Sequence, residues 1–303
     1  MNPAELERRL RSARNSEAWI AAVAEFFAAH GLVFGHGTDN AADEAFWLLR
    51  HLQGWADVDW RAPPAAEIVP RALDVARQRV EQRKPLAYLL GEAWFAGLKF
   101  VVDERVLVPR SPLAEVIERG FAPWCALEPG DRVLDIGTGS GCIAIATAHH
   151  CPGVLVDATD VSRDALTVAA RNVELHRVAE RVRLIEADLF PRGAAERRYR
   201  VIVSNPPYVP EAEVATLPPE YRHEPTIGLA SGASGFAAAE RILRGAAAWL
   251  ASDGVLFLEV GAGADAFAAA HARLALIELD FERGGDGVFV TTAAEIRDFL
   301  RLG

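Results

Sequence analysis

The 303-residue sequence lacks any apolar run long enough to cross a membrane. Stretches such as Val255 to Val260 fall far short of the roughly 20 residues that a transmembrane helix needs. The amino-terminal residues carry early charges without the apolar core of a secretory signal. We therefore expect a soluble, cytoplasmic protein.

Cysteine and positive charge are both scarce. The three cysteines, Cys125, Cys142 and Cys151, are odd in number and lack the paired spacing of a zinc site. We expect reduced thiols packed as small hydrophobic groups, with no disulfide and no bound metal. The formal net charge is −10. Because affinity for a nucleic-acid backbone comes largely from lysine and arginine, this charge argues against broad nucleic-acid contact and suits a basic protein partner.

The amino-terminal part of the chain has a helical pattern. Apolar residues recur at spacings of three and four in Pro3 to His30, Ala41 to Gln53 and Ile68 to Arg83, which is typical of amphipathic helices that pack together. Strand-like runs separated by turn residues follow from Glu92 to Val108 and predict a β-hairpin. We predict a helical domain over residues 1–90, a hairpin linker over 91–115 and a larger domain over 116–303.

Strands and helices alternate in the larger domain. Five short apolar runs each precede helical or loop sequence, which predicts a parallel sheet covered on both faces. These runs are RVLDIG, VLVDATD, VRLIEAD, RVIVSN and GVLFLEVG. Two more strands, in 274–279 and 287–292, are expected at an antiparallel edge. The fold class predicted is α/β with a mostly parallel sheet.

Polar and glycine-rich sequences follow the first three of these strands. The run DIGTGSGC, from Asp135 to Cys142, permits a sharp turn and close approach to a ligand, although a purely structural turn stays possible. Asp160 ends the second strand, where a carboxylate can accept ribose hydroxyls, and Asp188 with Leu189 ends the third, where they can flank an adenine. Each acid alone is also consistent with a helix cap or turn. No phosphate-binding lysine accompanies them, which favours an adenosyl ligand without phosphates.

The fourth strand ends in VSNPPYVP, from Val203 to Pro210. Its consecutive prolines lack N–H donors and have fixed φ, so a stiff non-helical loop must follow the strand. Such a loop holds the Asn205 amide and the Tyr208 ring in a fixed relation at the edge where parallel sheets bind ligands. The alternative is a proline-stiffened surface loop.

These motifs, in this order and spacing, resemble a class I S-adenosylmethionine-dependent methyltransferase of the NPPY subgroup. Three flanking segments narrow the resemblance to the protein-(glutamine-N(5)) methyltransferases of the HemK/Prm family: FGHGTDN, LAYLLGEAWFAGLKFVVDERVLVPRSPLAE and EPTIGLASGASGF. FGHGTDN and VPRSPLAE are similar to the branch that methylates the third protein of the large ribosomal subunit. The resemblance implies a Rossmann-like, seven-stranded sheet and methylation of a glutamine amide, with S-adenosylhomocysteine as product.

The motifs and the resemblance together assign roles to particular residues. The catalytic residues predicted are Asn205, Pro206 and Tyr208. Cofactor binding is predicted for Asp135, Gly137, Thr138, Gly139, Gly141, Asp160, Val161, Asp188, Leu189 and Asn205. Substrate contacts are predicted for Phe100, Arg110, Asn205, Pro206, Pro207 and Tyr208. Phe100 is equally consistent with ordinary core, Glu259 at the end of the fifth strand is a supporting or structural acid, and His36 in FGHGTDN is a functional or a simple turn residue.

Three other functions stay open on the sequence. One is methylation of a release factor. Another is an amino-methyltransferase that acts on adenine or cytosine, which would need a basic surface and a flipped base. The third is a non-catalytic adenosyl-binding adaptor in ribosome assembly. We expect a protein substrate bound by residues 1–90, namely a basic ribosomal protein of the large subunit, with no membrane and no specific nucleic-acid partner.

Overall fold

The computed structural model describes residues 1–193 and 198–302, and it separates the chain into two units. Unit 1 contains Met1–Ala93 together with Pro218–His223, and unit 2 contains Trp94–Leu217 and Glu224–Gly303. The sequence indicated an amino-terminal helical domain, but nothing in it pointed to the six residues that join unit 1 from the middle of the chain. None of the described helices is both long and apolar enough to span a membrane.

Unit 1 is a bundle of helices with a hydrophobic interior. Its elements are α1 (Pro3–Ser12), α2 (Ser16–Ala29), α3 (Ala41–Leu52), the 3-10 turn η1 (Ala66–Ile68), α4 (Val69–Gln82), α5 (Leu86–Leu90) and the 3-10 turn η2 (Pro219–His223). The first three helices begin after Asn2, Asn15 and Asn40, whose side chains accept hydrogen bonds from backbone N–H groups of the first turn. Trp19 and Phe27, both fully buried, fill the interior.

Buried charges hold the segment of η2 inside unit 1. Arg79 on α4 donates to Glu44 on α3, with Nε and Oε1 2.5 Å apart, and its Nη1 lies 3.4 Å from Glu220 Oε1. All three side chains are at most 3% exposed. The Val33 N–H also donates to Glu220, and Arg83 lies 2.8 Å from the same oxygen. The Glu220 carboxylate thus helps to fix six residues from the middle of the chain to the helical bundle.

The FGHGTDN turn also belongs to unit 1. His36 is buried, and its ring centroid lies 4.5 Å from that of Tyr221 in η2. The structure therefore places His36 against the inserted segment, which agrees with a structural part in the turn.

Unit 2 is built on a seven-stranded sheet. The hairpin strands β1 (Glu92–Phe95) and β2 (Leu98–Val101) form a separate two-stranded sheet, in which the first two residues of β1 still belong to unit 1. The strands of the large sheet are β3 (Arg132–Ile136), β4 (Leu155–Asp160), β5 (Val182–Glu186), β6 (Tyr199–Ser204), β7 (Leu250–Glu259), β8 (Ile277–Glu278) and β9 (Val288–Thr292). Their order is β5-β4-β3-β6-β7-β9-β8, and only the pairs made by β9 are antiparallel. The predicted parallel sheet with an antiparallel edge is confirmed.

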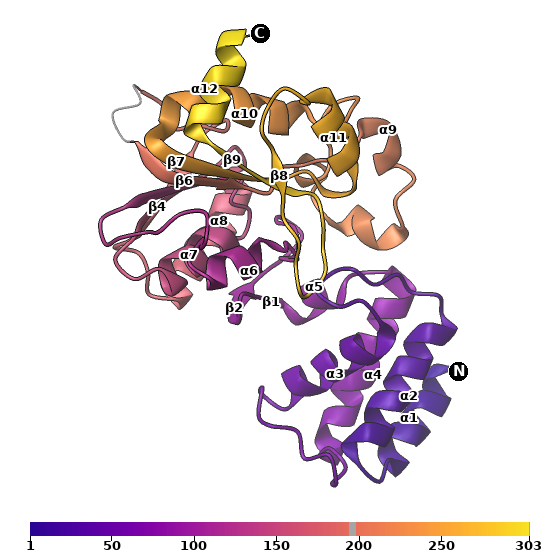
Figure 1. The fold of residues 1–303 in the computed structure, drawn as a ribbon. Helices are drawn as coiled ribbons and strands as arrows, with labels where there is room; N and C mark the ends of the chain where they lie inside the picture. The colour runs from indigo at the N-terminus through magenta and orange to yellow at the C-terminus, as the bar shows by residue number, and fades with distance from the viewer. Residues whose placement is uncertain (194–197, 303) are drawn as a thin grey trace. The chain divides into compact units, whose positions relative to one another are not determined.

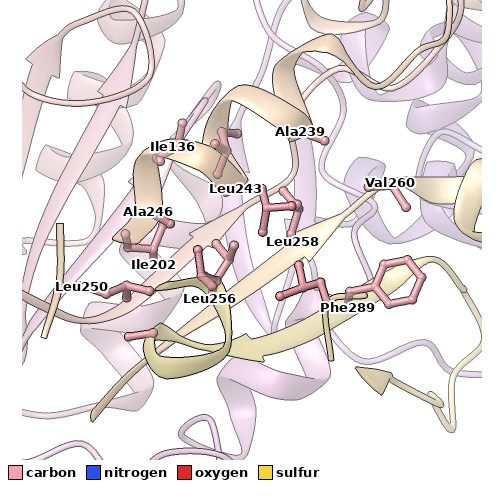
Figure 2. Close-up of a cluster of buried hydrophobic side chains, with 14 of the residues drawn as sticks. Ile136, Ile202, Ala239, Leu243, Ala246, Leu250, Leu256, Leu258, Val260 and Phe289 are labelled. Atoms are coloured by element: carbon pink, nitrogen blue, oxygen red, sulfur yellow. The ribbon is translucent and has the colours of Figure 1, made fainter. Parts of the chain in front are cut away.

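Helices cover both faces of this sheet, as Figure 1 shows. On one face lie α6 (Leu113–Glu118), α7 (Cys142–His150) and α8 (Arg163–Leu175), and on the other lie α10 (Ala237–Trp249) and α12 (Ala293–Leu302). The remaining short elements are α9 (Glu211–Val214), η3 (Thr226–Gly228), η4 (Gly261–Gly263) and α11 (Ala264–Ala270). In Figure 2, side chains of α10 such as Leu243 meet Leu256 and Leu258 of β7 in a buried cluster. Burial of both faces explains why the strands read as continuous apolar runs.

The cysteines of unit 2 agree with the sequence. Cys125, Cys142 and Cys151 are free thiols, and Cys125 and Cys151 are buried.

His150 ends α7 and pairs with the Ala96 carbonyl of the hairpin at 2.9 Å, so it packs the hairpin against the helix.

Candidate active site

The strand register of unit 2 brings the predicted motifs to one edge of the sheet. Ile136 pairs with Thr159 on one side and with Ser204 on the other, all in parallel. The glycine-rich loop, Asp160 and Asn205 therefore leave adjacent strands at the same level. Ligands bind at this edge in open parallel sheets, beside the point where the strand order reverses.

The glycine-rich loop closes on itself by backbone bonds and leaves space in front of it. Gly137, Gly139 and Gly141 all have positive φ, of 73°, 54° and 81°. A Cβ added at Gly137 or Gly139 would meet no atom within 4 Å, whereas one at Gly141 would meet Ile145 at 3.1 Å and the α8 residue Ala169 at 3.3 Å. The first two glycines thus border open space, and the third permits close helix packing.

Asp135 is a fully buried carboxylate with one unused oxygen. Its Oδ2 accepts hydrogen bonds from Thr138 Oγ1 at 2.6 Å and from the Ala144 N–H at 3.2 Å. Among the described residues, Oδ1 has no hydrogen-bond partner. Burial raises the pKa of Asp135 to about 7, against the opposing effect of the Thr138 bond. An unpaired buried oxygen of this kind favours a cationic or hydrogen-donating ligand group beside the loop.

Asp160 links the second strand end to the glycine-rich loop. Its Oδ2 accepts the Gly139 N–H at 2.9 Å, and its Oδ1 accepts the Ser162 N–H at 2.8 Å. Burial raises the pKa of Asp160, and these backbone bonds oppose the rise. The neighbouring Val161 is 53% exposed, which leaves an apolar surface next to the carboxylate.

Asp188 lies in a more open setting than its place at a strand end suggested. Its Oδ2 is 2.8 Å from Arg241 Nη2 of α10, and both side chains are more than half exposed. Leu189, with φ of 69°, accepts the Thr159 hydroxyl at its carbonyl oxygen. Thr159 thereby holds the loop that carries both residues against the sheet.

The NPPY loop is braced from the segment that follows η3. The Val209 N–H donates to the Leu229 carbonyl at 2.8 Å, and the Ser231 N–H donates to the Val209 carbonyl at 3.0 Å. Gly235 packs so closely that a Cβ there would lie 2.5 Å from the Tyr208 carbonyl oxygen. These contacts give the proline-rich loop a fixed path, as its sequence predicted.

Within this braced loop, the polar groups of Asn205 are unused. Asn205 is half-buried, and no described residue forms a hydrogen bond with its side chain or donates to the Pro206 carbonyl. A side-chain oxygen and a backbone carbonyl are therefore available as acceptors from consecutive residues. This arrangement suits a ligand with two N–H donors on one atom.

Comparison with known proteins agrees with this geometry. The methyltransferase small domain family matches residues 124–217. The ribosomal protein uL3 glutamine methyltransferase of Bordetella pertussis is 44% identical over 278 residues, which are 88% of this chain and 90% of that protein. The protein of the same name from Neisseria meningitidis is 45% identical, over 88% of this chain and 89% of its own length. The chain belongs to the ribosomal protein uL3 glutamine methyltransferases.

Among solved structures, the similarity is one of fold. The catalytic domain of hMettl16, in complex with hairpin 6 of the MAT2A 3′UTR, is 15% identical and matches 93% of this chain and 96% of its own with a TM-score of 0.50. The predicted class I methyltransferase fold and the predicted family, including its branch, are both confirmed.

Two predicted substrate contacts of this uL3-type methyltransferase have other partners in the structure. Phe100 is fully buried, and its ring centroid is 5.0 Å from that of His176 beyond α8. This packing favours the core alternative. Arg110 donates to both carboxylate oxygens of Glu224, at 2.5 Å and 2.8 Å. Contact of either residue with substrate stays a prediction.

Glu224 is a residue of this methyltransferase site that the sequence did not single out. It is buried and also accepts the Val108 N–H at 3.1 Å. Glu224 thus joins the segment before α6 to the segment that leads into the brace of the NPPY loop. In the sequence, Glu224 stands out only as the first residue of EPTIGLASGASGF. Its pairing with Arg110 could not be seen there, because the two residues are 114 positions apart.

Proposed function

We propose that the protein transfers a methyl group from S-adenosylmethionine to the side-chain amide nitrogen of a glutamine in ribosomal protein uL3. The observation that carries the proposal is the pair of unused acceptors at Asn205 and Pro206, on a braced loop beside the glycine-rich loop. The name shared by the 43–45% identical relatives supports uL3 over a release factor as substrate.

The residues at the strand ends fit S-adenosylmethionine. When bound, this cofactor supplies an electrophilic methyl group on a sulfonium. The open space at Gly137 and Gly139 admits a ligand close to the backbone, and the unpaired Oδ1 of Asp135 suits an ammonium group. Asp160 and the exposed Val161 suit a ribose and an apolar ring face.

Asn205 and Pro206 address the main difficulty of the reaction, which is the weak nucleophilicity of an amide. The amide lone pair is delocalised into the carbonyl. The Asn205 side-chain oxygen and the Pro206 carbonyl would accept the two amide N–H groups and stabilise the positive charge that grows on nitrogen as the N–CH₃ bond forms. Tyr208 would close the pocket with its ring, since aromatic faces attract cations. The extra proton on nitrogen then leaves to solvent.

Asp160→Ala is expected to weaken S-adenosylmethionine binding by about 1.5 to 3 kcal/mol. The change removes a charged acceptor for ribose and also the acceptor that holds the Gly139 N–H. Isothermal calorimetry with the cofactor measures the loss. Unchanged affinity would contradict the ribose assignment. The control is Glu186→Ala, because Glu186 ends the neighbouring strand β5 and is exposed.

Asp135→Asn is expected to weaken cofactor binding about 10-fold or more without lowering the stability of the free protein at pH 8. The asparagine oxygen can take over the bonds from Thr138 and Ala144, while its NH₂ group would repel an ammonium. In the folded protein Asp135 keeps a proton up to a pH of about 7, whereas the unfolded chain loses it near the ordinary value of 3.8. Its contribution to the free energy of unfolding therefore falls as pH rises between these values, and the variant lacks this fall.

Thermal unfolding at pH 5 and pH 8, with calorimetry for the cofactor, tests the Asp135 prediction. The control is Asp157→Asn, because Asp157 is buried but paired with Arg132 and Arg183 at 2.9 Å each. This control should lose stability and keep cofactor affinity. If Asp135→Asn instead behaved like Asp157→Asn, the ammonium assignment would be wrong.

Labelled cofactor and purified substrates test the proposed function itself. The enzyme is incubated with free uL3, with release factors, and with duplex DNA and RNA, and the labelled residue is mapped by mass spectrometry. We expect one N5-methylglutamine in uL3. Label in a release factor or in nucleic acid alone would replace the proposal by that alternative.

We propose further that unit 1 recognises the protein substrate, since a helical bundle has no part in the cofactor chemistry. Hydrogen exchange of the full chain with and without uL3 measures which amides become protected. Protection that reaches residues 1–90 supports this role, and protection confined to unit 2 contradicts it.

A further inference from the structure

Glu259 occupies a buried position next to the NPPY loop. It is the last residue of β7 and is 4% exposed. Leu258 pairs with Ser204 of β6 in parallel register, so Glu259 leaves its strand beside the point where Asn205 leaves the neighbouring strand. The carboxylate thus lies at the edge of the sheet that carries the predicted chemistry.

The partners of this carboxylate are hydroxyl groups. Ser111 Oγ donates to Glu259 Oε2 at 2.5 Å, and the Tyr208 hydroxyl also donates to Glu259. Arg110, whose charge acts on this carboxyl group, pairs with Glu224 at 2.5 Å. Burial raises the pKa of Glu259 to about 7, the hydroxyl bonds and the charge of Arg110 oppose the rise, and the charge of Asp286 adds to it. Burial of an acid that is bonded to neutral hydroxyl groups costs stability, which makes a purely structural purpose a poor explanation.

The same strand end also fixes the ring of Tyr208. Gly261 has a φ of 57°, and a Cβ there would lie 2.6 Å from Tyr208 Cε2. The ring therefore lies on the Gly261 backbone while its hydroxyl bonds to Glu259. Gly235 also lies close to the carbonyl oxygen of Tyr208, so this residue is packed both at its ring and at its backbone.

We propose that Glu259 is a positioning residue for methyl transfer: it accepts the Tyr208 hydroxyl at the end of β7 and so fixes the NPPY loop with Asn205 facing the substrate amide. The inference rests on the proposed function for the chemistry that the loop performs. It assigns to Glu259 an effect on turnover that acts through Tyr208, with no contact to substrate.

A double-mutant cycle tests this role. Glu259→Gln and Tyr208→Phe are each expected to lower kcat for uL3 about 10-fold, with little change in cofactor affinity. The double variant should lose no more activity than the single variant with the larger loss, because the two side chains act as one unit. Ser111→Ala is the comparison, since it removes the other hydroxyl bond to the same carboxylate and should affect kcat less than Tyr208→Phe. Multiplicative losses in the cycle would overturn the inference.

The pH dependence of kcat gives a readout that simple packing would not move. Ionised Glu259 accepts a hydrogen from each of the two hydroxyl groups, whereas the protonated acid donates from one oxygen, so one of these hydroxyls has to turn and accept instead. The kcat of the wild type is therefore expected to rise with pH through about 7, and Glu259→Gln should flatten this rise. The same rise in the variant would contradict the proposal.

A cycle of equilibrium unfolding in urea with the same variants needs no substrate. It separates this inference from the proposed function: absence of uL3 methylation by the wild type would refute the function, while the unfolding cycle would still measure the coupling of Glu259 with Tyr208. Additive free energies of unfolding would overturn the inference independently. Glu259→Asp, which keeps the charge and shortens the reach, provides a second variant if Glu259→Gln does not fold.

Discussion

Asn205→Ala is expected to lower turnover of uL3 about 100-fold or more, while affinity for S-adenosylmethionine changes little. The substitution removes one of the two acceptors that stabilise the developing charge on the amide nitrogen, and loss of a single preorganised group of this kind typically costs 10²- to 10³-fold in kcat. Because no described residue forms a hydrogen bond with the Asn205 side chain, the change should leave the loop in place. Single-turnover rates and calorimetry measure the two quantities.

Two controls make the Asn205 result specific. Asn205→Asp keeps an acceptor oxygen and should retain more activity than the alanine variant. On the substrate side, glutamate in place of the target glutamine presents carboxylate oxygens to two acceptors and should not be methylated, since neither acceptor would receive a donor. Asparagine should also fail, because it is one methylene shorter. A near wild-type rate for Asn205→Ala would show that the NPPY loop supports the site without acting on the amide.

Arg79→Met is expected to lower the free energy of unfolding by about 3 to 5 kcal/mol, as is typical when one partner of a buried ion pair is removed. Methionine fills much of the same volume but leaves Glu44 and Glu220 buried without their shared cation. Burial already raises the pKa of Glu44 despite the charge of Arg79. For Glu220, burial acts in the same direction, but the Val33 N–H and the charges of Arg83 and Arg79 bring its pKa below the ordinary value.

Urea unfolding of the full chain measures the effect of Arg79→Met. The matched control is Arg77→Met on the same helix, because Arg77 is 54% exposed and pairs with Asp74 and Glu81 only at 3.6 and 4.0 Å. Exposed pairs of this kind contribute about 0 to 1 kcal/mol. Similar losses for the two variants would mean that the buried network contributes no more than a surface pair.

The sheet and the strand-end motifs were predictable because their signals are local. A parallel strand buried on both faces needs an apolar run, and a glycine-rich turn or an NPPY loop carries its conformation in adjacent residues. Asp135, Asp160 and Asn205 were therefore found at the correct strand ends. Even there, the exposed ion pair of Asp188 with Arg241 was not foreseen, since Arg241 lies on a helix 53 residues further along.

The contacts that stiffen the site were not predictable from the sequence. Glu224 and Arg110 are 114 residues apart, and Ser111 and Glu259 are 148 apart. Nothing in the local pattern distinguishes such buried acids from solvated ones, because their burial depends on the packing of the whole unit. The same holds for Glu220, whose neighbours in sequence are those of an ordinary surface turn.

The membership of Pro218–His223 in unit 1 has a practical consequence for rebuilding this enzyme. A chimaera that exchanges only the amino-terminal segment for that of another methyltransferase would keep η2. It would lose Arg79 and Arg83, which pair with Glu220, and the backbone segment in which the Val33 N–H donates to the same carboxylate. The helical bundle is built from two separate segments of the chain, so a chimaera has to exchange both segments together.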